Sequence, residues 1–398
     1  MNTAYKLQGI HRHYEWGGNT FIPQLMHVDN AIGKPFAEYW MGAHPSAPAM
    51  VETAEGSRAL DQMIQENQVA FLGPKTAAQF GSLPYLFKIL DVEKMLSIQV
   101  HPSKENAEKG FLKEQEAGVP IDASYRNYKD QNHKPEVMVA LNDFWLLHGF
   151  MPANALKERL TSYAPLQTLL PVFGQDDYAG LYSHFMHLDQ STTDKVLKPL
   201  LEIAVHEVKA GKVDKSHPHW WANKYYNGIV PTSNVDKGIL SIYILNIVNV
   251  PKYHGVFQGA GLLHAYLEGQ NIELMANSDN VLRGGLTPKH IDIEELLDHV
   301  KFEPTYPSIL KGDFTSSNEL QFPCPVPDFG LTKITLTPGE TYTNKTSSFE
   351  MFLVMQGGVQ LDGIDLKPGE LAAVKAGAAF HIQSTGAETA VIFKSFVP

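Results

Sequence analysis

Two polar side chains near residue 100 have the types and the spacing of metal ligands. Gln99 and His101 stand two positions apart in the run 96–102, which alternates apolar and polar residues. Such alternation is typical of a strand with one buried face, and it places both side chains on the same face. Pro102 cannot donate to a strand ladder, so we expect the strand to end there, with Ser103 capping a following helix. Taken alone, such a pair is more often a hydrogen-bonded histidine beside a turn than half of a metal site.

Two later stretches supply donors that would complete such a site. Glu136 stands at the head of the apolar run 136–141, and His264 follows a glycine-rich turn at 255–261. Two imidazoles, a carboxylate and a carboxamide together suit a divalent metal and leave positions open for water or a substrate. The sequence therefore predicts a metal site formed by Gln99, His101, Glu136 and His264.

Five strings of residues together resemble the type I phosphomannose isomerases. The strings occur in the order of that family and extend over most of the chain, at 37–45, 96–102, 134–136, 264–266 and 279–289. The combination is specific, although each string alone is not. The resemblance implies a cupin fold and Zn²⁺ at the four donors above, with one ion per chain. The donor types alone would also allow manganese, cobalt or iron.

Basic residues are expected to bind an anionic substrate in the same site. Arg283 precedes two glycines, which permit a tight turn and the close approach of a ligand. A guanidinium always carries its charge and grips an oxyanion through a planar fork. The resemblance gives Arg283 an active-site role, for which a surface salt bridge is the alternative. It also makes Lys88, Ser97 and Lys289 contacts of phosphate or sugar, although Lys88 could instead extend to solvent from its apolar run.

Four further residues belong to the predicted site. Lys134 stands beside Glu136, and Glu273 lies between apolar neighbours, where burial would raise its pKa and suit it to proton transfer. A paired, structural role for Glu273 is nearly as strong an interpretation. The resemblance places Tyr266 at the sugar and makes Trp16 a wall of the pocket. Core packing is the competing interpretation for Trp16.

The resemblance implies an aldose–ketose isomerisation between mannose 6-phosphate and fructose 6-phosphate. A proton would move between C1 and C2 through an enediol(ate), and a Lewis-acidic metal with Arg283 could stabilise the charge on the oxygens. Lys88, Lys134, Glu273 and a metal-bound water all stay open as the base.

Two other functions remain as alternatives to isomerisation. One is a non-catalytic sugar-binding protein with two cupin domains, and the other is an iron-dependent cupin oxygenase. The glutamine in place of a second strand histidine and the set of lysines count against the oxygenase. Side activity on other aldoses stays open.

The pattern of turns predicts a mainly β protein with a helical insertion. Glycine and proline turns recur at short intervals after residue 310, as expected of a sandwich or jelly roll, and 239–248 has the composition of a strand. Between 151 and 230 the pattern changes to amphipathic helices. Together with the resemblance, this favours two cupin-type jelly rolls. The predicted divisions are a metal-binding domain at 1–150 and 231–310, a helical insertion at 151–230, and a C-terminal roll at 311–398.

Two histidine sites outside the predicted centre are not expected to bind metal. His381 stands alone in the C-terminal roll, so that roll should hold no ion. His217 and His219 are close in sequence, but Pro218 and the two tryptophans that follow make a packed loop the stronger interpretation.

The composition excludes some partners. A formal net charge of −11 over 398 residues argues against a nucleic-acid or anionic-membrane partner, since both need a basic face. The only cysteine, Cys324, cannot form an intrachain disulfide, the N-terminus has no apolar signal core, and no run is long enough to span a bilayer. We therefore expect a cytoplasmic protein. We also expect a monomer, although the residues do not fix the oligomeric state.

Overall fold

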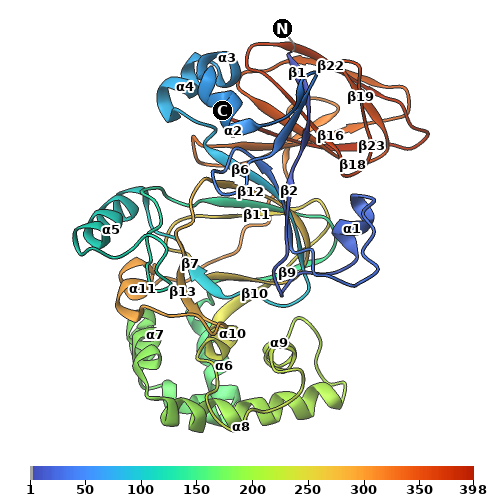
Figure 1. Cartoon of the computed structure of the whole chain (residues 1–398). Helices are drawn as coiled ribbons and strands as arrows, with labels where there is room; N and C mark the ends of the chain where they lie inside the picture. The colour runs from blue at the N-terminus through green and yellow to red at the C-terminus, as the bar shows by residue number, and fades with distance from the viewer. Residues whose placement is uncertain (1–2) are drawn as a thin grey trace.

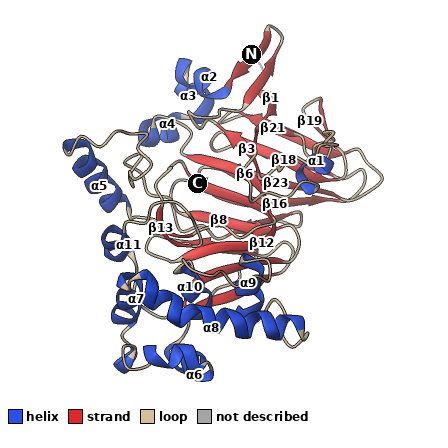
Figure 2. Ribbon diagram, turned by 60° about the horizontal axis from the view of Figure 1, so that its bottom comes forward, coloured by secondary structure: helices blue, strands red, loops and turns tan. Residues whose placement is uncertain are grey.

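The computed structural model describes residues 3–398, which form an elongated molecule with its sheets in the middle and at one end (Figure 1). A ten-stranded sheet occupies the middle, and a nine-stranded and a four-stranded sheet lie together at one end. Helices α6–α9 cover the other end, below the strands in Figure 2. The protein is mainly sheet with helices, as the turn pattern predicts.

The middle sheet is built around one long strand, β12 (His264–Ala276). This strand pairs antiparallel with β6 and β8 through its second half and with β9 and β7 through its first half. Its partners and their neighbours are β2 (Ile10–Arg12), β3 (Glu38–Gly42), β6 (Tyr85–Val92), β7 (Ile98–Val100), β8 (Glu136–Ala140), β9 (Phe144–Phe150), β10 (Leu245–Val250), β11 (Gly255–Gln258) and β13 (Leu282–Gly285). One strand therefore carries His264 at its start and Glu273 near its end.

A glycine allows β12 to change partners halfway. Gly269 has φ of +129°, and a Cβ there would lie 2.7 Å from the ring of Phe144. The register shifts just before it, between Tyr266 and Glu268. A larger residue would therefore disturb the bend that joins the two halves of the strand.

The terminal sheets combine the two ends of the chain. The nine-stranded sheet joins β1 (Ala4–Gln8), β4 (Met50–Thr53) and β5 (Gly56–Ala59) to strands after residue 312. Those later strands are β14 (Asp313–Phe314), β15 (Glu319–Phe322), β16 (Gly330–Leu336), β18 (Glu350–Gln356), β21 (Leu371–Val374) and β23 (Ala390–Phe396). The four-stranded sheet contains β17 (Thr341–Lys345), β19 (Val359–Leu361), β20 (Ile364–Leu366) and β22 (Ala379–Ser384). The N-terminal strands thus extend the C-terminal unit.

Separate cores hold these layers together. Phe87 and Ile89 of β6 and Ile272 of β12 point away from the interior of the middle sheet and pack with Met351 and Phe393 of the nine-stranded sheet. Alternate residues of the same strands, such as Lys88 and Glu273, face the other side. The middle sheet therefore has one face buried in packing and one face free to build a site.

Most of the longer helices gather at one end of the molecule and pack against the middle sheet. The helical end comprises α6 (Ala153–Ser162), α7 (Tyr178–His187), α8 (Gln190–Lys209) and α9 (Pro218–Tyr225), and it packs on the middle sheet through α10 (Gly238–Ile244) and α11 (Ile293–His299). The remaining α-helices are α1 (Phe21–Leu25), α2 (Leu60–Glu66), α3 (Gln68–Leu72), α4 (Pro74–Phe80) and α5 (Lys104–Glu116), and two short 3-10 helices lie at Ala164–Leu169 and Gly174–Asp176. Ser103 caps α5 by accepting a hydrogen bond from the amide of Asn106, as predicted.

Three local predictions need correction. The strand at 96–102 is shorter than expected, because β7 ends at Val100 and His101 lies in the following loop. The predicted strand 239–248 begins as helix α10, whose residues are all buried, and an apolar run buried on every side has no period that distinguishes helix from strand. His217 begins a helix rather than a loop, because it caps α9 and Pro218 suits the first helical position.

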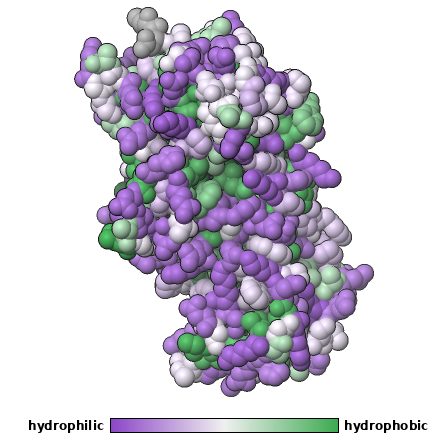
Figure 3. Space-filling view, turned by 90° about the vertical axis from the view of Figure 1, so that its right-hand side faces the viewer, coloured by the Kyte–Doolittle hydropathy of each residue, from purple (hydrophilic) through white to green (hydrophobic). Residues whose placement is uncertain are grey.

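The surface in Figure 3 is mostly hydrophilic, with hydrophobic residues scattered in small groups. Among residues 3–398, no helix is long and apolar enough to cross a bilayer.

Candidate metal centre and active-site cavity

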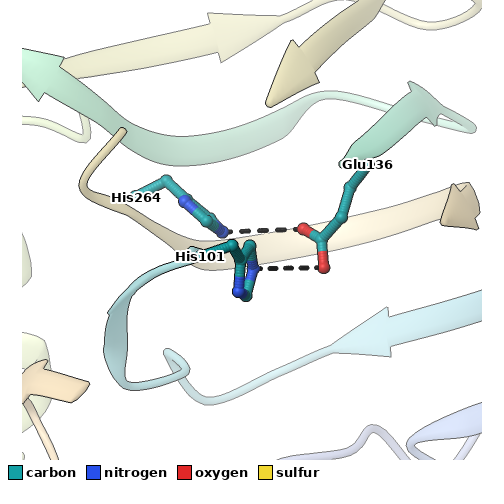
Figure 4. A group of neighbouring side chains, drawn as sticks. All are labelled: His101, Glu136 and His264. Carbon is teal, nitrogen blue, oxygen red and sulfur yellow. Dashed lines mark ion pairs between the residues drawn. The ribbon is translucent and has the colours of Figure 1, made fainter. Parts of the chain in front are cut away.

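Three of the predicted ligands meet in the interior of the middle sheet (Figure 4). His101 follows β7, Glu136 opens β8 and His264 opens β12, and all three are buried. Nε2 of His101 lies 3.4 Å from Oε1 of Glu136, and Nε2 of His264 lies 3.5 Å from its Oε2. Each residue can offer one ligand atom, and these atoms lie within 4.8 Å of one another. Residues 101, 136 and 264 are brought together only by the strand pairing.

The hydrogen bonds behind these ligands orient them for a metal. Nδ1 of His101 donates to the carbonyl of Asn280 at 3.2 Å, and Nδ1 of His264 donates to the carbonyl of Leu262 at 2.9 Å. Each ring therefore turns a lone pair on Nε2 toward the carboxylate. Both Nε2 atoms and Oε2 of Glu136 are buried without a hydrogen-bond partner among the described residues. Such converging, unpaired donors fit a divalent cation.

Electrostatics keep the ligands in the forms that bind a metal. Burial lowers the pKa of His101 to about 4, even though Glu136 opposes the shift. Burial alone would raise the pKa of Glu136, but His101, His264 and Lys134 together hold it well below its usual range. A neutral imidazole and an ionised carboxylate are the ligand forms of these residues.

The fourth predicted ligand, Gln99, lies beside this group. Gln99 pairs with His264 across β7 and β12 and with Arg283 across β7 and β13. Directly paired residues of an antiparallel ladder point to the same face. Gln99 is thus placed on the face of His264, and it lines the cavity above the centre.

A cavity of about 1000 Å³ opens on this side of the middle sheet. It is lined by seven of the predicted site residues, namely Trp16, Lys88, Ser97, Gln99, Lys134, Arg283 and Lys289. Lys224, Tyr225 and Asn227 of the helical end also line it. The cavity therefore lies between the middle sheet and the helical insertion.

Besides His101, Glu136 and His264, two more predicted residues do not line the cavity, namely Tyr266 and Glu273. The hydroxyl of Tyr266 donates to Oε1 of Glu273 at 2.7 Å, and both side chains are buried. Glu273 therefore connects Tyr266 to Lys88, which does line the cavity.

Lys88 is the residue in front of Glu273, and two carboxylates hold it. Its Nζ lies 3.0 Å from Oε2 of Glu273 and 3.7 Å from Oε2 of Glu38. Strand register explains the group, because Lys88 on β6 pairs with Glu273 on one side and with Trp40 on the other. Trp40 in turn donates from Nε1 to Glu38.

The charged side chains in this group shift the pKa values of their neighbours. Burial would lower the pKa of Lys88, but Glu273 and Glu38 raise it above its usual value. Burial raises the pKa of Glu273 despite the opposing charge of Lys88. Lys88 is therefore a fixed positive charge at the cavity wall.

Arg283 and Lys289 form a second basic group, hereafter the cationic wall. Among residues 3–398, neither has an ion pair with a carboxylate, whereas Lys88 and Lys134 do. Burial lowers the pKa of both, and Arg283 lowers that of Lys289 further. Two neighbouring cations without a counter-charge suit an anionic ligand.

Glycine fixes the position of Arg283 on the cationic wall. Gly285 has φ of +128°, and a Cβ there would lie 2.4 Å from the Cα of Gly238. The register of β13 shifts between Arg283 and Gly285. The glycines predicted to permit a tight turn therefore also let β13 pass close to the start of α10.

Sequence reasoning missed three residues of the site. Glu38 and Trp40 lie in the string 37–45 but were assigned no role there, although an acidic residue within a buried strand was a usable signal. His148 pairs with His264 on the edge opposite Gln99. Burial and then the charge of His264 lower the pKa of His148 to about 3. Nothing in the sequence around His148 indicated this placement.

Comparison with known proteins gives one consistent family. Residues 4–153 match the family described as phosphomannose isomerase type I, catalytic domain. The chain is 37% identical over 381 residues to the mannose-6-phosphate isomerase of Salmonella typhimurium, covering 93% of this chain and 94% of that protein. It is 33% identical over 436 residues to the enzyme of Rattus norvegicus, covering 99% and 96%.

Solved structures give the same result. The zinc-bound mannose 6-phosphate isomerase superposes with a TM-score of 0.87 at 33% identity, covering 100% of both chains. The Salmonella typhimurium enzyme bound to its substrate fructose 6-phosphate and zinc superposes equally well, with a TM-score of 0.87 at 33% identity and full coverage of both chains.

Proposed function

The chain belongs to the type I phosphomannose isomerases, and from this premise we propose which of its residues perform each part of the reaction. The protein is a metal-dependent aldose–ketose isomerase that interconverts mannose 6-phosphate and fructose 6-phosphate. Its metal is Zn²⁺. The observation that carries the assignment of the site is the buried His101–Glu136–His264 group beneath a cavity with an unpaired cationic wall.

We assign the metal to Gln99, His101, Glu136 and His264. The three charged or imidazole donors converge without other partners, and Gln99 stands next to His264 on the same face. Zinc bound there would act as a Lewis acid that polarises the substrate's oxygens without changing oxidation state.

Within the cationic wall, we propose that Lys289 binds the phosphate and that Arg283 faces the reacting end of the sugar. Arg283 and Lys289 lack carboxylate partners, and Ser97 lies on the same cavity with a hydroxyl that can donate. Trp16 supplies an apolar surface of the cavity for the sugar ring. A phosphorylated hexose would then lie with its reacting carbons toward Lys88 and Lys134.

The proton transfer is assigned by position within the cavity. Lys88 has two carboxylate partners, Glu273 at 3.0 Å and Glu38 at 3.7 Å, which favour its ammonium form, and Glu273 is itself engaged by Lys88 and does not line the cavity. Lys134 lines the cavity, and its Nζ lies 3.7 Å from Glu136. We therefore propose Lys134 for the transfer between C1 and C2, a role in which it must act as the neutral amine, accepting the proton from one carbon and returning it to the other. Lys88 and Arg283 stabilise the enediolate oxygens, and Glu273 positions Lys88.

We propose that the middle sheet and the terminal sheets are two cupin-type jelly rolls. The metal-binding domain would comprise 1–150 and 231–310, with 151–230 inserted as helices and 311–398 as a roll without metal. A hydrophobic core between the nine-stranded and four-stranded sheets supports the C-terminal roll, whereas the core of the helical end continues onto the middle sheet. The strands β1 and β4 depart from this division, because they belong to the first domain in sequence but pair within the sheet of the C-terminal unit.

The function is tested by a coupled assay on the zinc-loaded protein. Mannose 6-phosphate should yield fructose 6-phosphate, and the reverse reaction should proceed with no consumption of oxygen. Binding of the phosphosugar without turnover would favour the non-catalytic alternative, and oxygen uptake would favour the oxygenase.

Changing Lys289 to alanine should weaken the use of phosphosugar. Loss of one charged hydrogen bond to phosphate costs about 1.5–3 kcal/mol, or roughly 10- to 150-fold in kcat/KM. The measurement compares mannose 6-phosphate with unphosphorylated mannose, and the exposed Lys212→Ala serves as a control. Equal losses for both sugars would contradict a phosphate role for Lys289.

Changing Glu38 to glutamine should alter the pH dependence of kcat. Because Glu38 helps to raise the pKa of Lys88, its neutralisation should lower that pKa. Activity that needs the Lys88 ammonium is lost as pH rises through its pKa, so the basic limb of kcat should move to lower pH in Glu38→Gln. We expect about a tenfold loss of kcat near that limb.

The matched control for Glu38 is Glu15→Gln, which changes an exposed carboxylate of the same cavity. A uniform loss of kcat at every pH in Glu38→Gln would indicate a structural role, and would contradict positioning through the charge of Lys88.

A further inference from the structure

A second group of possible metal ligands lies in the helical end, outside the isomerase site. Glu207 is near the end of α8, His217 caps α9 and His219 is in its first turn. Each can offer one ligand atom, and these atoms lie within 4.8 Å of one another. The residues come from two helices that pack together, so an ion there would cross-link them.

Hydrogen bonds join the residues of this group to one another and to Tyr163. Nδ1 of His219 donates to Oε2 of Glu207 at 2.7 Å, and Nε2 of His217 lies 2.9 Å from the hydroxyl of Tyr163. Nδ1 of His217 accepts from the amide of His219 at 3.2 Å. An ion held by His219, Glu207 and Nε2 of His217 must replace the proton between His219 and Glu207 and the contact with Tyr163, whose hydroxyl oxygen could become a fourth donor. Because Nδ1 of His217 accepts from an amide, its ring proton is on Nε2, so binding must also move that proton to Nδ1 and give up the cap.

The group is accessible and its hydrogen bonding is incomplete. His219 is fully buried, whereas the side chain of Glu207 is 29% exposed, which leaves a path from solvent. Nε2 of His219 and Nη1 of Arg159 are buried without a hydrogen-bond partner among residues 3–398.

We propose that Glu207, His217 and His219 form a second site for a divalent transition metal, with Zn²⁺ as the ion that the His₂Glu donors favour. The site binds more weakly than the catalytic centre. In the catalytic group the two histidine nitrogens lie 3.4 and 3.5 Å from the oxygens of Glu136, which leaves room for an ion. In the second group Nδ1 of His219 lies only 2.7 Å from Oε2 of Glu207, so an ion must first break that hydrogen bond. The nearby charge of Arg159 opposes a cation as well. Isomerisation does not require this ion, which would instead stabilise the packing of α8 on α9.

The test is a titration of the one-zinc holoenzyme with Zn²⁺ alone. Calorimetry and elemental analysis after equilibrium dialysis should find a second, weaker equivalent, and the melting temperature should rise as that equivalent binds. In Glu207→Gln the amide oxygen can still accept from His219, so the helix contact is kept, but affinity for the second ion should fall at least tenfold.

Two more variants make the result specific. His217→Ala should lose the second equivalent in the same way, whereas Glu202→Gln, an exposed change on the same helix, should keep it. Isomerase activity should be unchanged in all three, which shows that the catalytic ion remains. A single equivalent in the unchanged protein up to millimolar zinc would overturn the proposal. So would a second equivalent that persists in both Glu207→Gln and His217→Ala, because that ion would be bound elsewhere.

Discussion

Replacing His264 with alanine is expected to remove the catalytic metal and the activity together. His264 supplies one of three buried donors, and its Nε2 faces Glu136 with no other partner among the described residues. Losing a Lewis acid that stabilises the enediolate costs several kcal/mol, and about 4 kcal/mol corresponds to roughly a 1,000-fold loss of kcat. Elemental analysis and the coupled assay measure the two losses on the same sample.

The control for His264 is His381→Ala, which changes an exposed histidine in the C-terminal unit and should keep both metal and activity. Full metal occupancy in folded His264→Ala would show that His264 is not a ligand. Active protein without any bound metal would contradict the metal-dependent mechanism. Circular dichroism and a thermal melt establish folding, because a buried histidine also contributes to packing.

Arg283→Ala is expected to lower kcat about 100- to 1,000-fold and to change KM little. A fixed cation that stabilises charge present only in the transition state acts on kcat, and loss of one such preorganised donor typically costs this much. Arg283 has no carboxylate partner among residues 3–398, so its charge is available to the substrate. Arg283→Lys should recover little, because the planar fork is lost while the charge remains.

The opposite kinetic pattern would assign Arg283 differently. A raised KM with kcat preserved would make Arg283 a phosphate ligand that acts equally on the ground state and the transition state. Near-normal kcat in a folded, zinc-loaded variant would leave Lys88 and the metal to stabilise the oxygens. Thermal melts of Arg283→Ala and Arg283→Lys must accompany the kinetics, because β13 packs closely against α10 at Gly285.

The sequence by itself determined the kinds of residue that form the site. The predicted ligands His101, Glu136 and His264 could be named because rare donor types stand at the ends of apolar runs within strings typical of one family. The helix after Ser103 was also predictable, because capping is a local signal. Local patterns thus identified elements and donors without placing them in space.

Only the tertiary structure decided which side chains work together. Lys88 meets Glu273 and Trp40 because β6 pairs between β12 and β3, and no local pattern encodes that register. The same pairing places Glu273 beside Lys88 and outside the cavity lining.

The helical end shows the same limit of local patterns. The buried run that forms α10 was predicted as strand, because a segment packed on every side carries no period. His217 and His219 were assigned to a packed loop, but folding places them beside Glu207 of another helix. Contacts between residues far apart in sequence depend on how whole elements bury their faces, and this is set by the packing of the complete chain.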